Sequence, residues 1–258
     1  MDERIPRVLT IAGSDSSAGA GIQLDLKVFN RLGAYGMTVV TAVTAQNTLG
    51  IQKIAKIAPR IVAAQIDSVT RDIGVDACKI GMLFSSQTIS VVAKRIRRRN
   101  IPNVVVDPLI AAKDGTALIA TKGVERLRRE LIPFALVVTP NVREAEILSG
   151  MTVKTLADLK AAAVEIYKMG CQYVLAKGGH LEGEPVDILF DGSNFVELSG
   201  VRLAGPPVHG TGCAFSAALA ARIAMGDDVL TAAQFSKNFV FELIRSAVKL
   251  GKGNLLIR

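Results

Sequence analysis

The feature that most constrains the fold of this chain is an alternation of short, β-branched apolar runs with longer segments of helical periodicity. The apolar runs end in glycine or in polar side chains; residues 7–12, for example, lead into Gly13, Ser14 and Asp15. Buried strands that alternate with helices are typical of parallel sheets covered by helices on both faces. Right-handed connections then bring the carboxyl ends of the strands to one edge of the sheet. The alternation therefore predicts an α/β fold with a central, mostly parallel sheet and one crevice at that edge.

Strands and helices are expected along all 258 residues. The expected strands are residues 7–12, 35–46, 51–58, 77–82, 103–107, 135–139 and 173–177, followed by a hairpin of 186–190 and 195–198. The expected helices include 59–72, 85–99, 121–131, 156–169 and two at the end of the chain, which finish near Met225 and Leu250. No internal repeat, linker or low-complexity run interrupts this order. Residues 1–258 are therefore expected to form a single domain.

Composition narrows the class of protein. Hydrophobic residues make up 50% of the chain, yet no apolar stretch approaches the roughly 18 residues of a membrane-spanning helix. The net charge of +8 suits an anionic small molecule or a polyanion, but the chain has no aromatic platform or recognised motif for binding nucleic acid. The three cysteines stand far apart and the N-terminus lacks the pattern of a leader, which favours a reducing cytoplasm. We therefore expect small-molecule chemistry with neither a nucleic acid nor a membrane as partner.

The segment 206–221, PPVHGTGCAFSAALAA, is the strongest local indication of a site. Gly210 and Gly212 flank Thr211 just before a helical run, so the backbone can turn tightly and present N–H groups at a helix start. These donors would stabilise negative charge on a transferred phosphoryl group. Cys213 lies in the same first turn, where the helix dipole favours a thiolate that could take a proton from a hydroxyl. The alternative is a glycine turn entering a buried helix, with Cys213 as a small core residue.

The first strand leads into a second candidate element, the loop 13–21. Its glycines do not have the spacing of a dinucleotide fingerprint, and no P-loop lysine follows. Asp25 falls one turn into the next helix, where it could accept a hydrogen bond from a ligand amino group or act as a first-turn acid. Gln46 follows the second strand and suits the edge of a pyrimidine or pyridine ring, unless it is a solvated loop residue.

Three charged residues at later strand ends complete the set of candidates. Asp107 ends one strand and could hold Mg²⁺, and Glu144 is a second acid on the first turn of a helix, where it could equally serve the helix N-terminus. Lys177 ends another strand before Gly178 and could reach a phosphate. Together with the segment 206–221, these residues indicate phosphoryl transfer to a hydroxyl on a small polar ring.

The motifs also resemble a known family over essentially the whole chain. The chain contains, in order, the segments TIAGSDSSAGAGIQLDLK, GAYGMTVVTAVTAQNT, CKIGML, VVVDP, VTPNVREAEIL, AKGGH and HGTGCAFSAALAA. As a set, these look like the hydroxymethylpyrimidine/phosphomethylpyrimidine kinases of thiamine biosynthesis. The resemblance implies a ribokinase-like, three-layer αβα fold and ATP with Mg²⁺ as the phosphoryl donor. It also implies two successive reactions, on 4-amino-5-hydroxymethyl-2-methylpyrimidine and then on its monophosphate, in a homodimer.

The resemblance assigns roles to residues that match the family's motifs. The residues it places around the pyrimidine are Gly13, Asp25, Gln46 and Met82, with Asp25 and Gln46 reading the amino and nitrogen edge of the ring. The remaining assignments are Cys213 as general base, an anion hole of Gly210, Thr211 and Gly212, Asp107 and Glu144 around Mg²⁺ and phosphate, and Lys177 on the nucleotide phosphates.

Two alternatives and two departures accompany this resemblance. Pyridoxal or pyridoxine kinase is the closest alternative, although Gln46 and Met82 favour the aminopyrimidine; a binding protein that has lost catalysis is the other. The first loop carries Ala18 where many members have glycine, which reduces backbone freedom. The added carboxylate of Asp114 is expected to repel a monophosphate substrate and to weaken the second phosphorylation.

Overall fold

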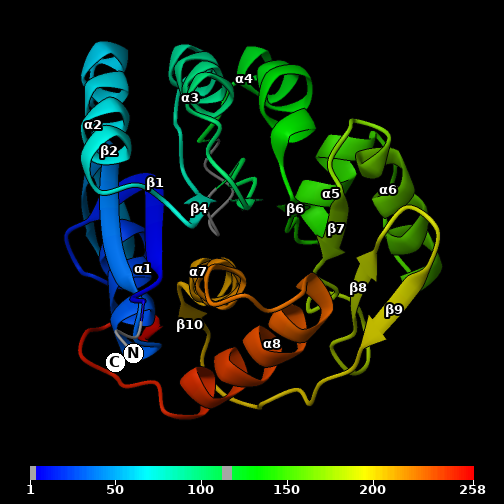
Figure 1. Ribbon diagram of the computed structural model, residues 1–258. Helices are drawn as coiled ribbons and strands as arrows, with labels where there is room; N and C mark the ends of the chain where they lie inside the picture. The colour runs from blue at the N-terminus through cyan, green and yellow to red at the C-terminus, as the bar shows by residue number, and fades with distance from the viewer. Residues whose placement is uncertain (1–3, 112–117) are drawn as a thin grey trace.

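A nine-stranded sheet forms the centre of the protein, as seen in a computed structural model that describes residues 4–111 and 118–258 (Figure 1). The strands lie in the order β3-β2-β1-β4-β5-β6-β7-β8-β9. Six of them, from β2 to β7 in this order, pair in parallel, and β3, β8 and β9 are antiparallel additions at the two edges. Their bounds are β1 Arg7–Asp15, β2 Tyr35–Asn47, β3 Gly50–Lys56, β4 Ala77–Ile80, β5 Val104–Val106, β6 Val137–Val138, β7 Tyr173–Ala176, β8 Asp187–Phe190 and β9 Phe195–Leu198. The predicted mostly parallel sheet is confirmed.

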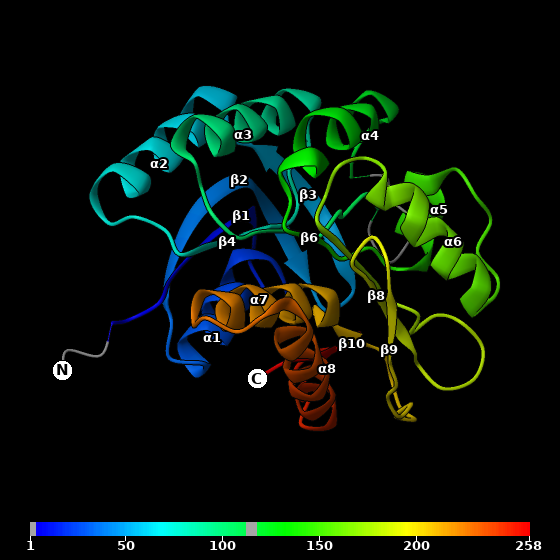
Figure 2. The same cartoon turned by 45° about the vertical axis from the view of Figure 1, so that its right-hand side comes forward.

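Helices cover both faces of this sheet, so the expected three layers are also confirmed (Figure 2). The helices on one face are α2 Pro59–Asp72, α3 Ser86–Arg99, α4 Thr121–Arg126, α5 Val142–Ser149 and α6 Leu156–Tyr167. The helices on the other face are α1 Gly21–Arg31, α7 Thr211–Ala224 and α8 Val229–Arg245. Because successive strand residues point to opposite faces, Val104 and Val106 of β5 belong to the first core and Val105 to the second.

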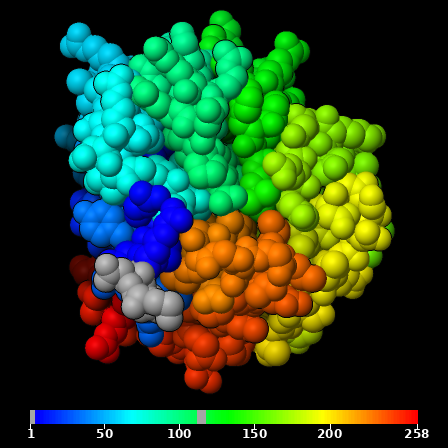
Figure 3. All heavy atoms as spheres, viewed as in Figure 1, coloured from blue at the N-terminus to red at the C-terminus, as the bar shows by residue number. Residues whose placement is uncertain are grey.

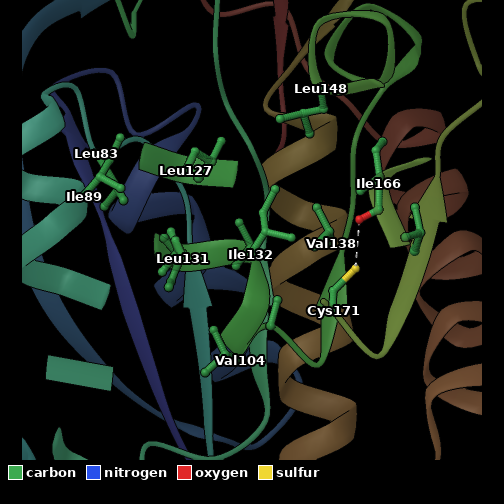
Figure 4. Packing of buried hydrophobic residues seen from close by; sticks show 14 of the residues in the cluster. Leu83, Ile89, Val104, Leu127, Leu131, Ile132, Val138, Leu148, Ile166 and Cys171 are labelled. Carbon is green, nitrogen blue, oxygen red and sulfur yellow. Dashed lines mark hydrogen bonds between the residues drawn. The ribbon is translucent and has the colours of Figure 1, made fainter. Parts of the chain in front are cut away.

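The first core is closely packed around the short central strands (Figure 4). Leu127 and Leu131, from a π-helical turn that continues α4, and Ile132 lie beside Val104 and are almost completely buried. A continuous apolar contact of this kind fixes the strand ends in place. The side chains at those ends are therefore presented on a rigid support.

Several helix boundaries follow the local signals in the sequence. Pro59 opens α2, and the Ser85 hydroxyl caps α3 by accepting from the Thr88 N–H. Asn141 and Glu144 form a reciprocal capping box at the start of α5. The first two starts agree with the predicted ones to within one residue, and Glu144 lies on the first turn of α5, as expected.

The C-terminal end departs from the prediction. The last helix ends at Arg245 rather than near Leu250, and a strand that the sequence did not indicate, β11 Leu255–Leu256, pairs in parallel with β10 Val208–His209. Thr48 fixes the intervening turn, because its hydroxyl accepts from the Gly253 N–H and its carbonyl from the Asn254 N–H. The end of the chain therefore lies against its N-terminal part, red beside blue in Figure 3.

Within residues 4–111 and 118–258, no helix combines the length and the apolar character needed to cross a bilayer.

Candidate active site

A large cavity opens at the carboxyl ends of the parallel strands. Its volume is about 1020 Å³, and its walls come from the ends of β1, β2 and β7, the loops after β4 and β5, the starts of α5 and α7, and part of α8. All the expected site residues except Asp25 line it, namely Gly13, Gln46, Met82, Asp107, Glu144, Lys177, Gly210, Thr211, Gly212 and Cys213. The edge of the sheet that the sequence singled out therefore does carry one hollow in which these residues meet.

The start of α7 forms one wall of the cavity. Gly210 precedes the helix with φ of 82°, and a Cβ on it would lie 2.1 Å from the Gly19 carbonyl oxygen, so only glycine fits. Gly212 faces a charged pair, because a Cβ there would lie 3.4 Å from Lys177 Nζ and 4.0 Å from Asp107 Oδ2. The first-turn N–H groups, which lack partners within the helix, thus lie next to an ammonium group. This wall suits a phosphate.

Cys213 lies in that first turn and is partly exposed, whereas Cys78 and Cys171 are buried. Burial raises the pKa of the Cys213 thiol and the charges of Asp25 and Asp107 add to the rise, while Lys79 and a hydrogen bond from the Gly21 N–H lower it. Burial therefore opposes the effect expected of the helix dipole on the thiol, and the role of Cys213 as a base stays a prediction. Burial raises the pKa of Cys78 and of Cys171 to about 12.

Asp107 and Lys177 form an ion pair in the cavity wall, with 3.1 Å between Oδ1 and Nζ. The hydroxyls of Thr139 and Ser216 also approach Asp107, at 3.4 and 3.3 Å. Although burial alone would raise the pKa of Asp107, Lys177 and Lys79 hold it below its ordinary value. Asp107 is therefore an anion held in place by three donors and open to a ligand on its cavity side.

Glu144 is the second acid of this wall. Burial raises the pKa of Glu144 to about 7, Lys177 opposes the rise, and the negative charge of Asp107 contributes to it. Two nearby carboxylates with oxygen donors suit a magnesium ion that keeps several waters and phosphate oxygens as its other ligands. Among residues 4–111 and 118–258, no group of three or more histidine, cysteine, aspartate or glutamate side chains is arranged to hold a metal by itself. Asp107 and Glu144 therefore fit a metal that arrives with a phosphate, not a permanent protein-held ion.

Asp25 is not among the residues that line the cavity, and its expected contact with a ligand amino group stays a prediction. Its carboxylate is fully buried, lies 2.9 Å from Lys79 Nζ and accepts from the Thr10 hydroxyl at 2.6 Å. Both oxygens bond to Lys79, which itself contributes to the cavity wall. Burial alone would lower the pKa of Lys79, yet Asp25 raises it, and the lysine stays charged.

Lys79 is a residue that the sequence reasoning missed. It interrupts the apolar run ACKIGM, and a lysine inside a buried strand is rare unless it is paired. The position of a lysine inside this apolar run was the feature of the sequence that could have indicated a buried ion pair. Its register partner on β1 is Thr10, so both side chains reach Asp25 from adjacent strands.

The other residues expected around the ring, Gly13, Gln46 and Met82, also line the cavity. Gly13 packs against Met82, because a Cβ on Gly13 would lie 2.3 Å from the Met82 Cε. Gln46 contacts His209, with 2.8 Å between the two Nε2 atoms. His209 and its neighbour Asp15 were not among the expected residues, although His209 directly precedes Gly210 in the sequence.

The two departures noted in the sequence differ in what the structure describes. Ala18 has φ of 55°, a left-handed conformation that glycine adopts more easily. Asp114 lies outside the described residues, and its expected effect on a monophosphate stays a prediction.

Comparison with known proteins agrees with this geometry. Residues 15–258 match the family model described as phosphomethylpyrimidine kinase. A hydroxymethylpyrimidine/phosphomethylpyrimidine kinase of Bacillus subtilis is 44% identical over 252 residues, which is 97% of this chain and 93% of that protein. A crystal structure of phosphomethylpyrimidine kinase from Clostridium difficile has a TM-score of 0.84 at 40% identity and covers 93% of this chain and 100% of that one.

Pyridoxal kinases are also similar in structure. The ADP complex of a Bacillus subtilis pyridoxal kinase has a TM-score of 0.93 at 39% identity and covers 99% of this chain and 97% of that one. The fold is thus shared by kinases of two ring alcohols, while the family model and the curated relatives agree on one of them. On the family match over residues 15–258 and on these identities, the chain belongs to the phosphomethylpyrimidine kinase family.

Proposed function

We propose that this protein is an ATP-dependent kinase that phosphorylates 4-amino-5-hydroxymethyl-2-methylpyrimidine and then its monophosphate, giving the pyrophosphate used in thiamine biosynthesis. One observation carries the proposal: a single cavity joins an amide suited to a ring edge, Gln46, to the N-terminus of α7 and the Asp107–Lys177 pair. This is the arrangement that phosphoryl transfer from a nucleotide to a ring alcohol requires.

The acceptor is held between Gly13, Gln46 and Met82, with its hydroxymethyl group directed at Cys213. In the first reaction Cys213 first gives its own proton to solvent, with the charge of Lys79 favouring the thiolate, and the thiolate then takes the hydroxyl proton as the oxygen attacks the γ-phosphorus. The bond from oxygen to γ-phosphorus forms, the bond to the β,γ-bridging oxygen breaks, and ADP leaves. In the second reaction a phosphate oxygen of the monophosphate is the nucleophile, so no hydroxyl proton has to be removed. Cys213 is therefore needed most in the first step.

The donor end of the cavity stabilises charge. The N–H groups of Thr211, Gly212 and Cys213 point from the first turn of α7 to the position of the transferred phosphoryl group, and Lys177 adds a positive charge beside them. Asp107 and Glu144 would hold Mg²⁺ through carboxylate oxygens and bound water. When bound, Mg²⁺ supplies a counter-charge to the phosphate oxygens.

Pyridoxal kinase is the second candidate, favoured by one observation. The solved pyridoxal kinases match this chain with TM-scores of 0.91 to 0.93, and one Staphylococcus aureus structure is a complex with AMP-PCP and pyridoxal. The hydroxymethyl group of either ring would reach Cys213 equally well. The curated relatives and the family model favour the pyrimidine.

Phosphorus NMR of the products formed from each ring alcohol with excess ATP tests the proposal. We expect the pyrimidine monophosphate first and the pyrophosphate after it, with slow turnover of pyridoxal. A strong preference for pyridoxal would reverse the assignment, and absence of ADP with every alcohol would indicate a binding protein without catalysis. As a ring-side control, Gln46→Ala should weaken pyrimidine binding in calorimetry without changing ATP binding.

Three finer proposals accompany this function. Dependence on Mg²⁺ is supported by the two acids of the cavity wall, and titration of activity with the metal tests it. A homodimer is proposed from the family resemblance, to be tested by sedimentation. A cytoplasmic location is proposed from the separated, unpaired cysteines.

A further inference from the structure

Three polar side chains around Gln46 do not take part in the chemistry described so far. Asp15, Thr44, Gln46 and His209 all line the cavity and come from β1, β2 and β10. Gln46 is one of the residues expected around the ring. Its contacts decide how the Gln46 amide is presented to a ligand.

The amide of Gln46 has a partner on each side. Its Nε2 lies 2.8 Å from His209 Nε2, and its Oε1 lies 3.2 Å from the Thr44 hydroxyl oxygen. As placed, the amide N–H donates to a histidine nitrogen that carries no proton. If that nitrogen carries a proton, it can donate to Gln46 only when the amide turns over and presents its oxygen.

Thr44 can satisfy the amide in either orientation. Its hydroxyl proton has two acceptors within reach, the Ser14 carbonyl oxygen at 3.0 Å and Gln46 Oε1 at 3.2 Å. When the amide nitrogen faces Thr44, the hydroxyl gives its proton to Ser14 and accepts from the amide. The choice between the two orientations therefore rests with His209.

Asp15 acts on the proton of His209. Its Oδ2 lies 3.4 Å from His209 Nε2, and the carboxylate is held by the Ser17 N–H and hydroxyl, both at 2.8 Å. Although burial would raise the pKa of Asp15, its hydrogen bonds with His209 and Ser17 hold it below the ordinary value. The anion favours a proton on Nε2, whereas the amide N–H of Gln46 favours a lone pair there. Asp15 and Gln46 thus favour opposite states of His209 Nε2, one with a proton and one without.

The backbone fixes His209 in this position. His209 pairs with Leu256 in the small parallel sheet, so the C-terminal strand holds it from behind. A Cβ on Gly19 would lie 2.7 Å from the His209 Cδ2, so Gly19 is the residue that lets the ring approach. The imidazole has little freedom to turn away from Gln46.

We propose that His209 sets the orientation of the Gln46 amide and thereby determines which ring alcohols the cavity accepts. An aminopyrimidine edge presents an N–H donor beside a ring-nitrogen acceptor, so it matches one orientation of an amide and opposes the other. A ring with a hydroxyl at that edge lacks this strict order, because a hydroxyl donates or accepts. The role in ring choice rests on the proposed function; the coupling of His209 to Gln46 does not.

The coupling can be measured in the protein without ligand. The chain has two histidines, His180 and His209, so ¹⁵N-histidine NMR gives few signals and His180→Asn assigns them. At neutral pH we expect His209 Nε2 without a proton in the wild type, and a shift of the proton to Nε2 in Gln46→Met, where Asp15 acts alone. Identical nitrogen shifts in the wild type and in Gln46→Met would overturn the proposal.

The effect on ring choice needs a matched pair of variants. His209→Gln keeps a polar atom near the place of Nε2, whereas the shorter side chain of His209→Asn does not reach Gln46. We expect His209→Asn to weaken pyrimidine binding by roughly 5–10-fold in calorimetry, with pyridoxal and AMP-PCP nearly unchanged, and His209→Gln to retain most of the affinity. Gly19→Ala, which displaces the imidazole, should behave like His209→Asn.

Three results of these binding experiments would count against the proposal or against the function on which it rests. An equal loss for both rings and for AMP-PCP would show that His209 only supports the fold, and an unchanged pyrimidine affinity in His209→Asn would remove it from ring choice. If the wild type binds neither ring, the proposed function fails, while the histidine NMR still tests the coupling.

Discussion

Two lysine–carboxylate pairs of similar length lie at different depths of this molecule. Lys79 and Asp25 are 2.9 Å apart with both side chains 0% exposed, whereas Lys177 and Asp107 are 3.1 Å apart with side chains 15% and 5% exposed. Lys79 lies within β4 and contributes to the cavity wall, but its side chain is fully buried against Asp25, while Lys177 follows the last residue of β7 and keeps part of its side chain exposed at the cavity. Lys79 is the residue before the last of β4 and Lys177 is the residue after the last of β7, so a shift of two residues along a strand separates a fully buried (sealed) pair from an accessible one.

Because the two pairs differ in burial, we expect them to have different roles in the protein. In the sealed pair the ammonium group of Lys79 is bonded to both oxygens of Asp25, so we expect it to act on the site chiefly through its charge and its rigidity. The accessible pair keeps a side open to the cavity, where a phosphate can compete for Lys177 and a metal for Asp107. The same two residue types thus support the fold in one place and the chemistry in the other.

The strongest test of this contrast is Lys79→Met. The substitution leaves the Asp25 carboxylate buried without a cation, and we expect a loss of about 3–5 kcal/mol in the free energy of unfolding. Urea titration followed by circular dichroism measures it. Lys79→Met combined with Asp25→Leu removes both charges and should recover most of the loss; a double variant no more stable than the single one would contradict the sealed-pair interpretation.

Lys177→Met should lower turnover much more than it lowers stability, the opposite of Lys79→Met. Asp107 keeps two hydroxyl donors and contact with the cavity, so we expect a loss below about 1.5 kcal/mol in stability. The rate constant for turnover should fall by roughly 10²–10³-fold, because a charge beside the transferred phosphoryl group is lost. Steady-state kinetics with Lys177→Arg as the charge-preserving control checks this. A large loss of stability with turnover intact would make the two pairs equivalent.

Cys213→Ala removes the group that lies between the two pairs. We expect turnover of the ring alcohol to fall by roughly 10²-fold or more, with ring binding nearly intact in calorimetry. Because Cys78 and Cys171 are buried, alkylation by iodoacetamide should modify Cys213 first in the wild type and provide an independent measure of its reactivity. Unchanged turnover in Cys213→Ala would remove the thiol from the mechanism.

The sequence predicted those features that depend on local pattern. Strand and helix alternation predicted the layers, because a buried parallel strand needs an uninterrupted apolar run and a crossover helix. Ser85 and Pro59 predicted helix starts, since a cap or a first-turn proline acts within a few residues of the start. The glycines and charges at strand ends predicted the cavity, because topology alone brings those ends together.

The missed features depend on contacts between distant segments. The position of Asp25 in a helix was predictable, but the side it faces is decided by Lys79, which is 54 residues away in the sequence. The strand of Leu255–Leu256 is too short to have a period, and it places His209 only through pairing across the chain. The pKa of Cys213 depends on its burial as well as on the helix dipole, and only the second can be seen in the sequence.

A third ion pair, between Arg7 and Asp76, lies at the surface, and we expect it to contribute least of the three to stability. Asp76 binds Arg7 through both carboxylate oxygens, with side chains 14% and 31% exposed, and the Arg7 hydrogen bond holds the pKa of Asp76 to about 2. Because the pKa is lowered in the folded state, the pair stabilises the protein above about pH 4, and this contribution is lost as the pH falls through 2. Asp76→Asn should therefore cost about 0.5–1 kcal/mol at pH 7 and much less near pH 2, as measured by urea unfolding at both pH values. An equal effect of Asp76→Asn at both pH values would show that the carboxylate charge contributes nothing, and depth would then no longer rank the three pairs.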